Sequence, residues 1–93
     1  MKERIGVIGA GSWGTTLANL LAKKGHPVRL WSYEAEVAAQ INERRENTKY
    51  LRGITLSENL EATTSLETCV ADAEVVVSAR ERHPRADRGD PAY

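Results

Sequence analysis

The amino-acid sequence predicts an α/β protein built on a doubly wound parallel sheet, and two observations lead to that prediction. Short runs rich in β-branched residues alternate with segments whose apolar residues recur at helical spacing, in the order β-α-β-α-β-α-β. A glycine-rich turn follows the first of these runs and opens the first helical segment. Alternation of this kind is typical of parallel strands joined by right-handed helical crossovers.

The first half of the chain predicts a strand, a helix and a second strand. Residues 4–8 form a short β-rich run, and a helical pattern covers residues 13–24. Gly25 and Pro27 end that helix, and residues 28–31 form the second strand. The helix is expected to present one apolar face, made of Leu17, Leu20 and Leu21.

The second half predicts two more helices and two more strands. A helix over residues 34–46 is expected to bury Val37, Ala38 and Ile41, and a loop over 47–59 leads to a weak strand at 60–63. The run Thr64-Ser65-Leu66-Glu67 fits a capping box, which predicts a short helix through about Ala71. The continuous run Val75–Val77 predicts a strand covered on both faces of the sheet.

Composition narrows the class of protein further. The 93 residues include 13 basic and 13 acidic side chains, so charge gives no reason to expect nucleic acid or an anionic membrane as a partner. The single cysteine, Cys69, excludes an internal disulfide and a cysteine-cluster metal site, and we expect it to be a small buried residue. Without a secretory signal or an apolar run of membrane-spanning length, the sequence predicts a cytoplasmic protein.

The glycine-rich turn reads Gly9-Ala10-Gly11-Ser12-Trp13-Gly14, a G-x-G-x-x-G pattern between a predicted strand and a predicted helix. In that context the pattern indicates a dinucleotide-binding Rossmann fold. Gly9 is expected to make the tight turn, Gly11 to let a pyrophosphate approach the backbone, and Gly14 to let the helix pack closely on the strand. The N-terminus of the helix would then face the phosphates.

The end of the second strand is where such folds recognise the adenosine ribose, about 20 residues beyond the glycines. The sequence places Ser32, Tyr33 and Glu34 there. Ser32 suits either NAD or NADP, and Tyr33 is able to stack on adenine. Glu34 is able to reach the ribose or to favour the N-terminus of the following helix. An acidic residue without an arginine leans towards NAD and leaves NADP open.

The segment from Ile5 to Ala18 resembles the N-terminal signature of bacterial NAD(P)-dependent glycerol-3-phosphate dehydrogenases. The aromatic residue followed by Gly-Thr-x-Leu-Ala, here from Trp13 to Ala18, is more specific than the glycines alone. The resemblance covers residues 1–79 and continues in four further segments: Val28–Trp31, Asn47–Gly53 (with Arg52 in place of the usual proline), Leu60–Thr63 and Ala73–Ala79.

The resemblance implies a site and a reaction. Ser12 and Trp13 would contact the cofactor, Ser32 and Tyr33 would flank the adenosine, and Tyr50 is similar to a cofactor-contacting tyrosine. The family's enzymes transfer a hydride between glycerol 3-phosphate and NAD(P), giving dihydroxyacetone phosphate. Residues 1–79 would form a truncated Rossmann domain with strand order 3-2-1-4, which supplies mainly the adenosine–pyrophosphate half of the cofactor site.

Residues 80–93 break the pattern, because they contain four arginines and two prolines but no Leu, Ile or Val. We expect a disordered tail or a lost reading frame there. The lysines and the mostly helical substrate domain that the resemblance implies would lie beyond this point, so no catalytic residue is assigned and the 93-residue chain alone is expected to be inactive. An open sheet edge at Val75–Val77 favours self-association.

Two alternatives remain. One is a stand-alone module that binds NAD without catalysis, and the other is a Rossmann fold that binds S-adenosylmethionine. The full three-glycine pattern with Ser12 and Trp13 argues against the second alternative.

Overall fold

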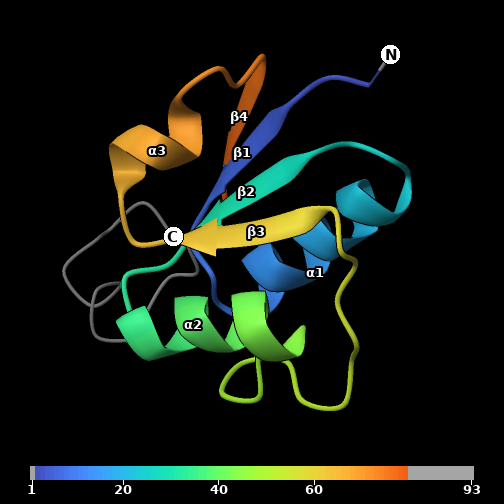
Figure 1. Ribbon diagram of the computed structural model, residues 1–93, viewed down its shortest axis with the longest axis vertical. Coiled ribbons are helices and arrows are strands. Elements are labelled where there is room, and N and C mark those ends of the chain that lie inside the picture. The colour runs from blue at the N-terminus through green and yellow to red at the C-terminus, as the bar shows by residue number, and fades with distance from the viewer. Residues whose placement is uncertain (1, 80–93) are drawn as a thin grey trace, which may run out of the picture.

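The computed structural model describes residues 2–79, which form one four-stranded parallel sheet flanked by helices (Figure 1). The predicted alternation is confirmed, and so is the strand order, which is β3-β2-β1-β4. The tail prediction for residues 80–93 lies outside the described residues. The elements in chain order are β1 (Ile5–Ile8), α1 (Ser12–Lys23), β2 (Val28–Trp31), α2 (Ala35–Arg44), β3 (Leu60–Thr63), α3 (Leu66–Val70) and β4 (Val75–Ser78).

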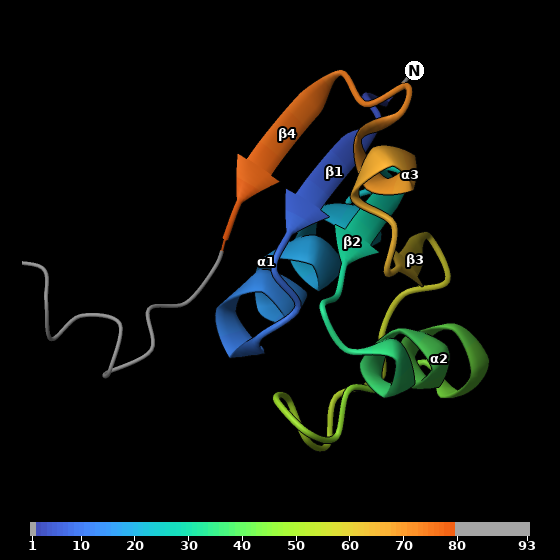
Figure 2. The ribbon, with the colours of Figure 1, turned by 90° about the vertical axis from the view of Figure 1, so that its left-hand side faces the viewer.

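The strand order places α3 on the opposite face of the sheet from α1 and α2. The chain steps in one direction from β1 to β2 and β3, and then returns across the sheet to place β4 beside β1. With right-handed crossovers, a reversal of direction moves the connecting helix to the other face. Figure 2 shows this arrangement, with α1 and α2 together on one side of the sheet and α3 on the other.

The core lies between the sheet and the two longer helices. Val7, Leu30 and Leu60 are fully buried on three neighbouring strands. The predicted inward residues of α2 are confirmed, since Val37, Ala38 and Ile41 are all buried. Helix α2 ends at Arg44, two residues earlier than predicted, because Arg45 adopts a left-handed backbone with φ of 59°.

The prediction of a leucine face on α1 is wrong in part. The helix turns its small residues to the sheet, burying Gly14, Ala18 and Ala22, while Leu20 is 53% exposed. Leu17 and Leu21 are only partly buried at the flanks of the core. The close approach of the helix at Gly14 leaves no room for large side chains on the inner face, so the leucines lie to the side.

Two further predictions need correction near α3. Ser65, and not Thr64, is the N-cap, because the Ser65 hydroxyl accepts a hydrogen bond from the Thr68 backbone N–H. The expected cover on both faces of the Val75–Val77 strand is also absent, since Val75 is 37% and Val76 48% exposed. The reason is topological: β4 is an edge strand in the described part of the chain, and α3 packs chiefly over β1, β2 and β3.

Within residues 2–79, none of the helices combines the length and apolar character needed to cross a lipid bilayer.

Candidate functional site

The loops that leave β1 and β2 meet at the carboxyl edge of the sheet. Gly9 follows β1 and donates its backbone N–H to the carbonyl of Trp31, the last residue of β2, at 3.1 Å. Ligands of parallel α/β sheets bind outside this edge, at the point where the strand order reverses. Here that point lies between β1 and β4, because the chain leaves β1 towards β2 and β3 and then returns to place β4 on the other side of β1.

The three glycines of the loop have different physical reasons to be glycine. Gly9 has a φ of 115°, a conformation that residues with a side chain rarely adopt. A Cβ atom on Gly14 would lie 1.7 Å from the Gly9 carbonyl oxygen, so a side chain cannot be accommodated there. Gly11 has a φ of −76°, which any residue tolerates, so its backbone conformation does not require glycine.

The N-terminus of α1 begins at this loop. Gly11 is the N-cap and brings no capping side chain, and the first turn of the helix holds no acidic residue. The partial positive charge of the helix N-terminus is therefore not offset by a carboxylate of its own first turn, which favours an anion site there. Ser12 and Trp13 open this first turn.

The two residues that directly follow β2 differ in exposure, because Ser32 is buried and Tyr33 is exposed. The Ser32 side chain is buried, and its hydroxyl accepts from the Glu34 backbone N–H at 3.1 Å and donates to the Glu34 carbonyl at 2.8 Å. These bonds use the hydroxyl to shape the turn into α2. Tyr33 is 85% exposed and stands beside this turn.

The loop after α2 is fastened to the glycine loop by Asn47, a residue that sequence reasoning did not assign to the site. Asn47 is fully buried, and its side-chain amide donates to the Ala10 carbonyl at 3.1 Å and to the Thr15 hydroxyl at 2.9 Å. Its own carbonyl accepts from the Leu51 N–H at 2.7 Å, which closes the turn 47–51. The available signal was its place at the start of the Asn47–Gly53 segment.

The same turn is fastened to the end of β2 by an ionic cluster of Glu34, Lys49 and Tyr50. The Tyr50 hydroxyl donates to Glu34 Oε1 at 2.6 Å, and Lys49 Nζ pairs with Glu34 Oε2. The Glu34 side chain is 23% exposed and that of Lys49 is 52% exposed. Tyr50, a predicted site residue, is therefore held beside the end of β2 together with Ser32 and Tyr33.

The cluster shifts the pKa of each of its members. The hydrogen bonds from Lys49 and then Tyr50 lower the pKa of Glu34 below its ordinary value of 4.5. The hydrogen bond to Glu34 raises the pKa of Lys49, and the same carboxylate raises the pKa of the Tyr50 phenol. At neutral pH the cluster thus holds a carboxylate, an ammonium group and a neutral phenol.

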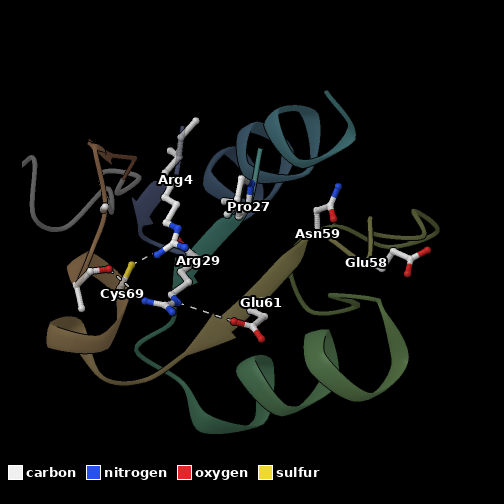
Figure 3. Close-up of a pocket in the computed structure, with 11 residues that line it drawn as sticks. Arg4, Pro27, Arg29, Glu58, Asn59, Glu61 and Cys69 are labelled. Carbon is white, nitrogen blue, oxygen red and sulfur yellow. Dashed lines mark hydrogen bonds and ion pairs between the residues drawn. The ribbon is translucent and has the colours of Figure 1, made fainter. Parts of the chain in front are cut away.

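A separate pocket of about 340 Å³ lies at the amino end of the sheet (Figure 3). Arg4 and Arg29 reach into it, but Arg29 already donates to the Thr68 and Ala71 carbonyls at 2.9 and 3.1 Å and pairs with Glu61 at 3.8 Å. The arginine thus closes the last turn of α3. This is the end of a parallel sheet where dinucleotides do not bind.

Cys69 lies on the wall of the same pocket and is buried, as expected. Burial raises the pKa of its thiol, so the thiolate needed for nucleophilic or redox chemistry is disfavoured. No group of three or more potential ligands able to hold a metal ion occurs among residues 2–79.

The comparisons with known proteins agree with one another. A family model described as the NAD-dependent glycerol-3-phosphate dehydrogenase N-terminus matches residues 4–83. The NAD(P)+ glycerol-3-phosphate dehydrogenase of Chlorobium luteolum is 52% identical over 75 residues, and that of Geobacter metallireducens is 57% identical over 77 residues. These matches cover 81% and 83% of this chain, and the chain spans 22% and 23% of those relatives.

The solved structures that this chain resembles are also glycerol-3-phosphate dehydrogenases. The glycerol-3-phosphate dehydrogenase of Coxiella burnetii aligns with a TM-score of 0.78 at 37% identity, over 85% of this chain and 24% of the other. The enzyme of Saccharomyces cerevisiae aligns with a TM-score of 0.77 at 36% identity, over 86% of this chain and 26% of the other.

Proposed function

Because the chain belongs to the family of NAD-dependent glycerol-3-phosphate dehydrogenase N-termini, we propose that it binds NAD or NADP at the carboxyl edge of its sheet. The observation that carries the proposal is the fastening of three segments at that edge. The glycine loop, the turn after β2 and the turn 47–51 are joined by buried hydrogen bonds and an ionic cluster. A binding site held in this way loses little entropy when the ligand arrives.

The proposal gives the predicted site residues distinct roles. Gly9 and Gly14 set the path of the loop, and Gly11 leaves space for the pyrophosphate at the N-terminus of α1. In this proposal the partly exposed rings of Trp13 and Tyr50 flank the cofactor, and Tyr33 offers an exposed ring to adenine at the end of β2. Ser32 acts indirectly, since its hydroxyl shapes the turn that carries Tyr33 and Glu34.

For the longer relatives, the proposed contribution of this segment is to hold the adenosine–pyrophosphate half of the cofactor. The reaction transfers a hydride between the nicotinamide and carbon 2 of glycerol 3-phosphate. That step needs a group to handle the hydroxyl proton and cations to bind the substrate phosphate. The resemblance places both beyond Ala79, so residues 1–79 act as a partial cofactor domain, and the 93-residue chain alone is expected to bind NADH weakly and to turn over no dihydroxyacetone phosphate.

The proposal extends to the location and the partners of the chain, and a second candidate function stands beside it. With one buried cysteine and balanced charge, the chain suits the cytoplasm and a small-molecule partner, and its net charge of zero gives no reason to expect nucleic acid. The exposed β4 edge favours association with another strand. A stand-alone NAD-binding module is the second candidate, favoured by the complete pairing of buried side-chain polar atoms within residues 2–79.

The test is a titration of the purified 93-residue chain with NADH, beside a Gly11→Val variant. The backbone angles of Gly11 allow a side chain, and because valine is a poorer N-cap than glycine the variant is expected to lose about 1 kcal/mol in the free energy of unfolding and still to fold. Its added side chain fills the space for the pyrophosphate, so NADH binding is expected to disappear. Equal binding by the two proteins would contradict the proposed site.

An assay with NADH and dihydroxyacetone phosphate separates the two candidate functions from a complete enzyme. Oxidation of NADH by the 93-residue chain would contradict the expected inactivity. A cooperatively melting monomer that NADH stabilises, without turnover, would favour the stand-alone module.

A further inference from the structure

The contact between Glu34 and Lys49 brings opposite charges to the place where NAD and NADP differ. Glu34 is the N-cap residue of α2 and follows Gly14 by 20 residues. At about this distance from the glycines, Rossmann folds place the group that recognises the adenosine ribose. Lys49 arrives from the turn 47–51, whose position against the glycine loop is fixed by buried Asn47.

We propose that Lys49 is the residue that admits a 2′-phosphorylated cofactor, by leaving Glu34 and pairing with the phosphate, while Glu34 favours the unphosphorylated one. This inference rests on the proposed function. It assigns the choice between the two cofactors to one carboxylate–ammonium pair and predicts opposite effects for its two members.

The chemistry of the two cofactors supplies the reason. NAD presents a ribose hydroxyl, which donates to a carboxylate, and the carboxylate of Glu34 retains lone pairs beyond those used by Lys49 and Tyr50. NADP presents a phosphate with a charge of about −2. A phosphate is repelled by Glu34 and attracted to the ammonium group beside it.

The ammonium group of Lys49 is more mobile than the rest of the turn 47–51. Lys49 has a half-exposed side chain on a four-carbon stem, so its ammonium group is able to turn from the carboxylate without moving the backbone. Asn47 and Tyr50 keep the turn in place when it does, because their hydrogen bonds to the glycine loop and to Glu34 do not involve Lys49. The residues directly after β2, Ser32 and Tyr33, bring no cation of their own.

The experiment titrates the 93-residue chain and three variants, Lys49→Gln, Glu34→Gln and Lys23→Gln, with NADH and NADPH. Lys49→Gln is expected to weaken NADPH binding about three- to fivefold, the size of an exposed ion pair, and to leave NADH binding within twofold. Glu34→Gln is expected to strengthen NADPH binding and weaken NADH binding. Lys23→Gln, which removes the same charge at the far end of α1, is the matched control and is expected to change neither.

Lys49→Arg keeps the charge and is expected to restore NADPH binding, and a cooperative melting transition in each variant verifies that it remains folded. The inference is overturned if Lys49→Gln weakens both cofactors equally, or if Glu34→Gln weakens NADPH. It is also overturned, together with the proposed function, if the unaltered chain binds neither cofactor. Binding of both cofactors by the unaltered chain with no selective effect of Lys49 overturns this inference alone.

Discussion

Strands β2 and β4 flank β1 on its two sides, and both are rich in apolar residues, yet they have opposite burial. In β2, Val28 and Leu30 are almost completely covered, whereas Val75 and Val76 of β4 are more than one third exposed. Strand β2 has a parallel neighbour on each side and helices over both faces, while β4 is an edge strand within residues 2–79 and α3 packs chiefly over the other three strands. The apolar side chains on the β2 side of β1 are thus covered by neighbouring elements, while those of β4 remain accessible to solvent.

The three segments joined by side-chain contacts, namely the glycine loop, the turn after β2 and the turn 47–51, all lie on the β2 side or next to β1. Asn47 binds the glycine loop, and Glu34 binds the turn that carries Lys49 and Tyr50. Substitutions on this side should therefore cost stability, while substitutions on β4 should change association and leave stability nearly unaltered.

Gly14→Ala is expected to have the largest effect, because its Cβ atom would overlap the Gly9 carbonyl oxygen at 1.7 Å. Backbone on both sides of the clash cannot move aside cheaply, so we expect a loss of about 3 kcal/mol or more in the free energy of unfolding. Urea denaturation followed by circular dichroism measures it. Gly53→Ala is the control: no atom lies within 4 Å of its Cβ, and only its positive φ of 84° costs about 1–2 kcal/mol.

Asn47→Leu is expected to follow, with a loss of about 2–3 kcal/mol, because the buried Ala10 carbonyl and Thr15 hydroxyl lose a donor. Asn59→Ala is the matched variant at the other end of the sheet, where the exposed Asn59 donates to the Ala22 carbonyl at 3.1 Å. Its expected cost is about 1 kcal/mol or less. Equal losses in the two variants would contradict the central position given to the turn 47–51.

The ionic cluster predicts a moderate dependence on pH at the turn 47–51. The folded pKa of Glu34 lies below 4.5. Its contribution to the stability of the folded state is therefore complete above that pH and is lost as the pH falls through the folded pKa. The folded pKa values of Lys49 and Tyr50 are raised. Their contributions to stability are therefore complete below about pH 10 and are lost as the pH rises through the folded pKa values. The Tyr50 ring resonances should report both transitions, and the acid transition should vanish in Glu34→Gln.

Val76→Lys should have the smallest effect on stability, less than about 0.5 kcal/mol, because the side chain it replaces is half exposed on an edge strand. Its effect should appear in sedimentation velocity, where a charge on the edge is expected to reduce self-association. A large loss of stability in this variant would show that β4 is as tightly packed as β2 and would contradict the difference in burial between the two strands.

The sequence was sufficient for the elements and the glycine loop, because these depend on local patterns, whereas the strand order was predicted from the resemblance of residues 1–79 to a known family. Alternating β-branched and helical segments gave the sheet, and the glycine spacing gave a turn whose geometry the positive φ of Gly9 confirms. The boundaries shifted by one or two residues where a single side chain or backbone angle decided them, as at Ser65 and Arg45.

What the sequence did not predict depends on contacts between distant segments. The inner face of α1 follows from the distance between Gly14 and the Gly9 carbonyl, and the exposure of Val75 follows from the absence of a covering neighbour within residues 2–79. The role of Asn47 required knowing that the turn after α2 folds back onto the glycine loop, 37 residues earlier in the chain. Local patterns carry no information about such approaches.

The most direct test of the proposed site is a map of backbone amide shifts in the 93-residue chain during titration with NADH. We expect the changes to be concentrated in residues 9–14, 32–34 and 47–51, at the carboxyl edge of the sheet, and the amides around Arg4 and Arg29 to be unaffected. Shifts centred on the pocket at the amino end of the sheet, or no specific shifts at all, would contradict it.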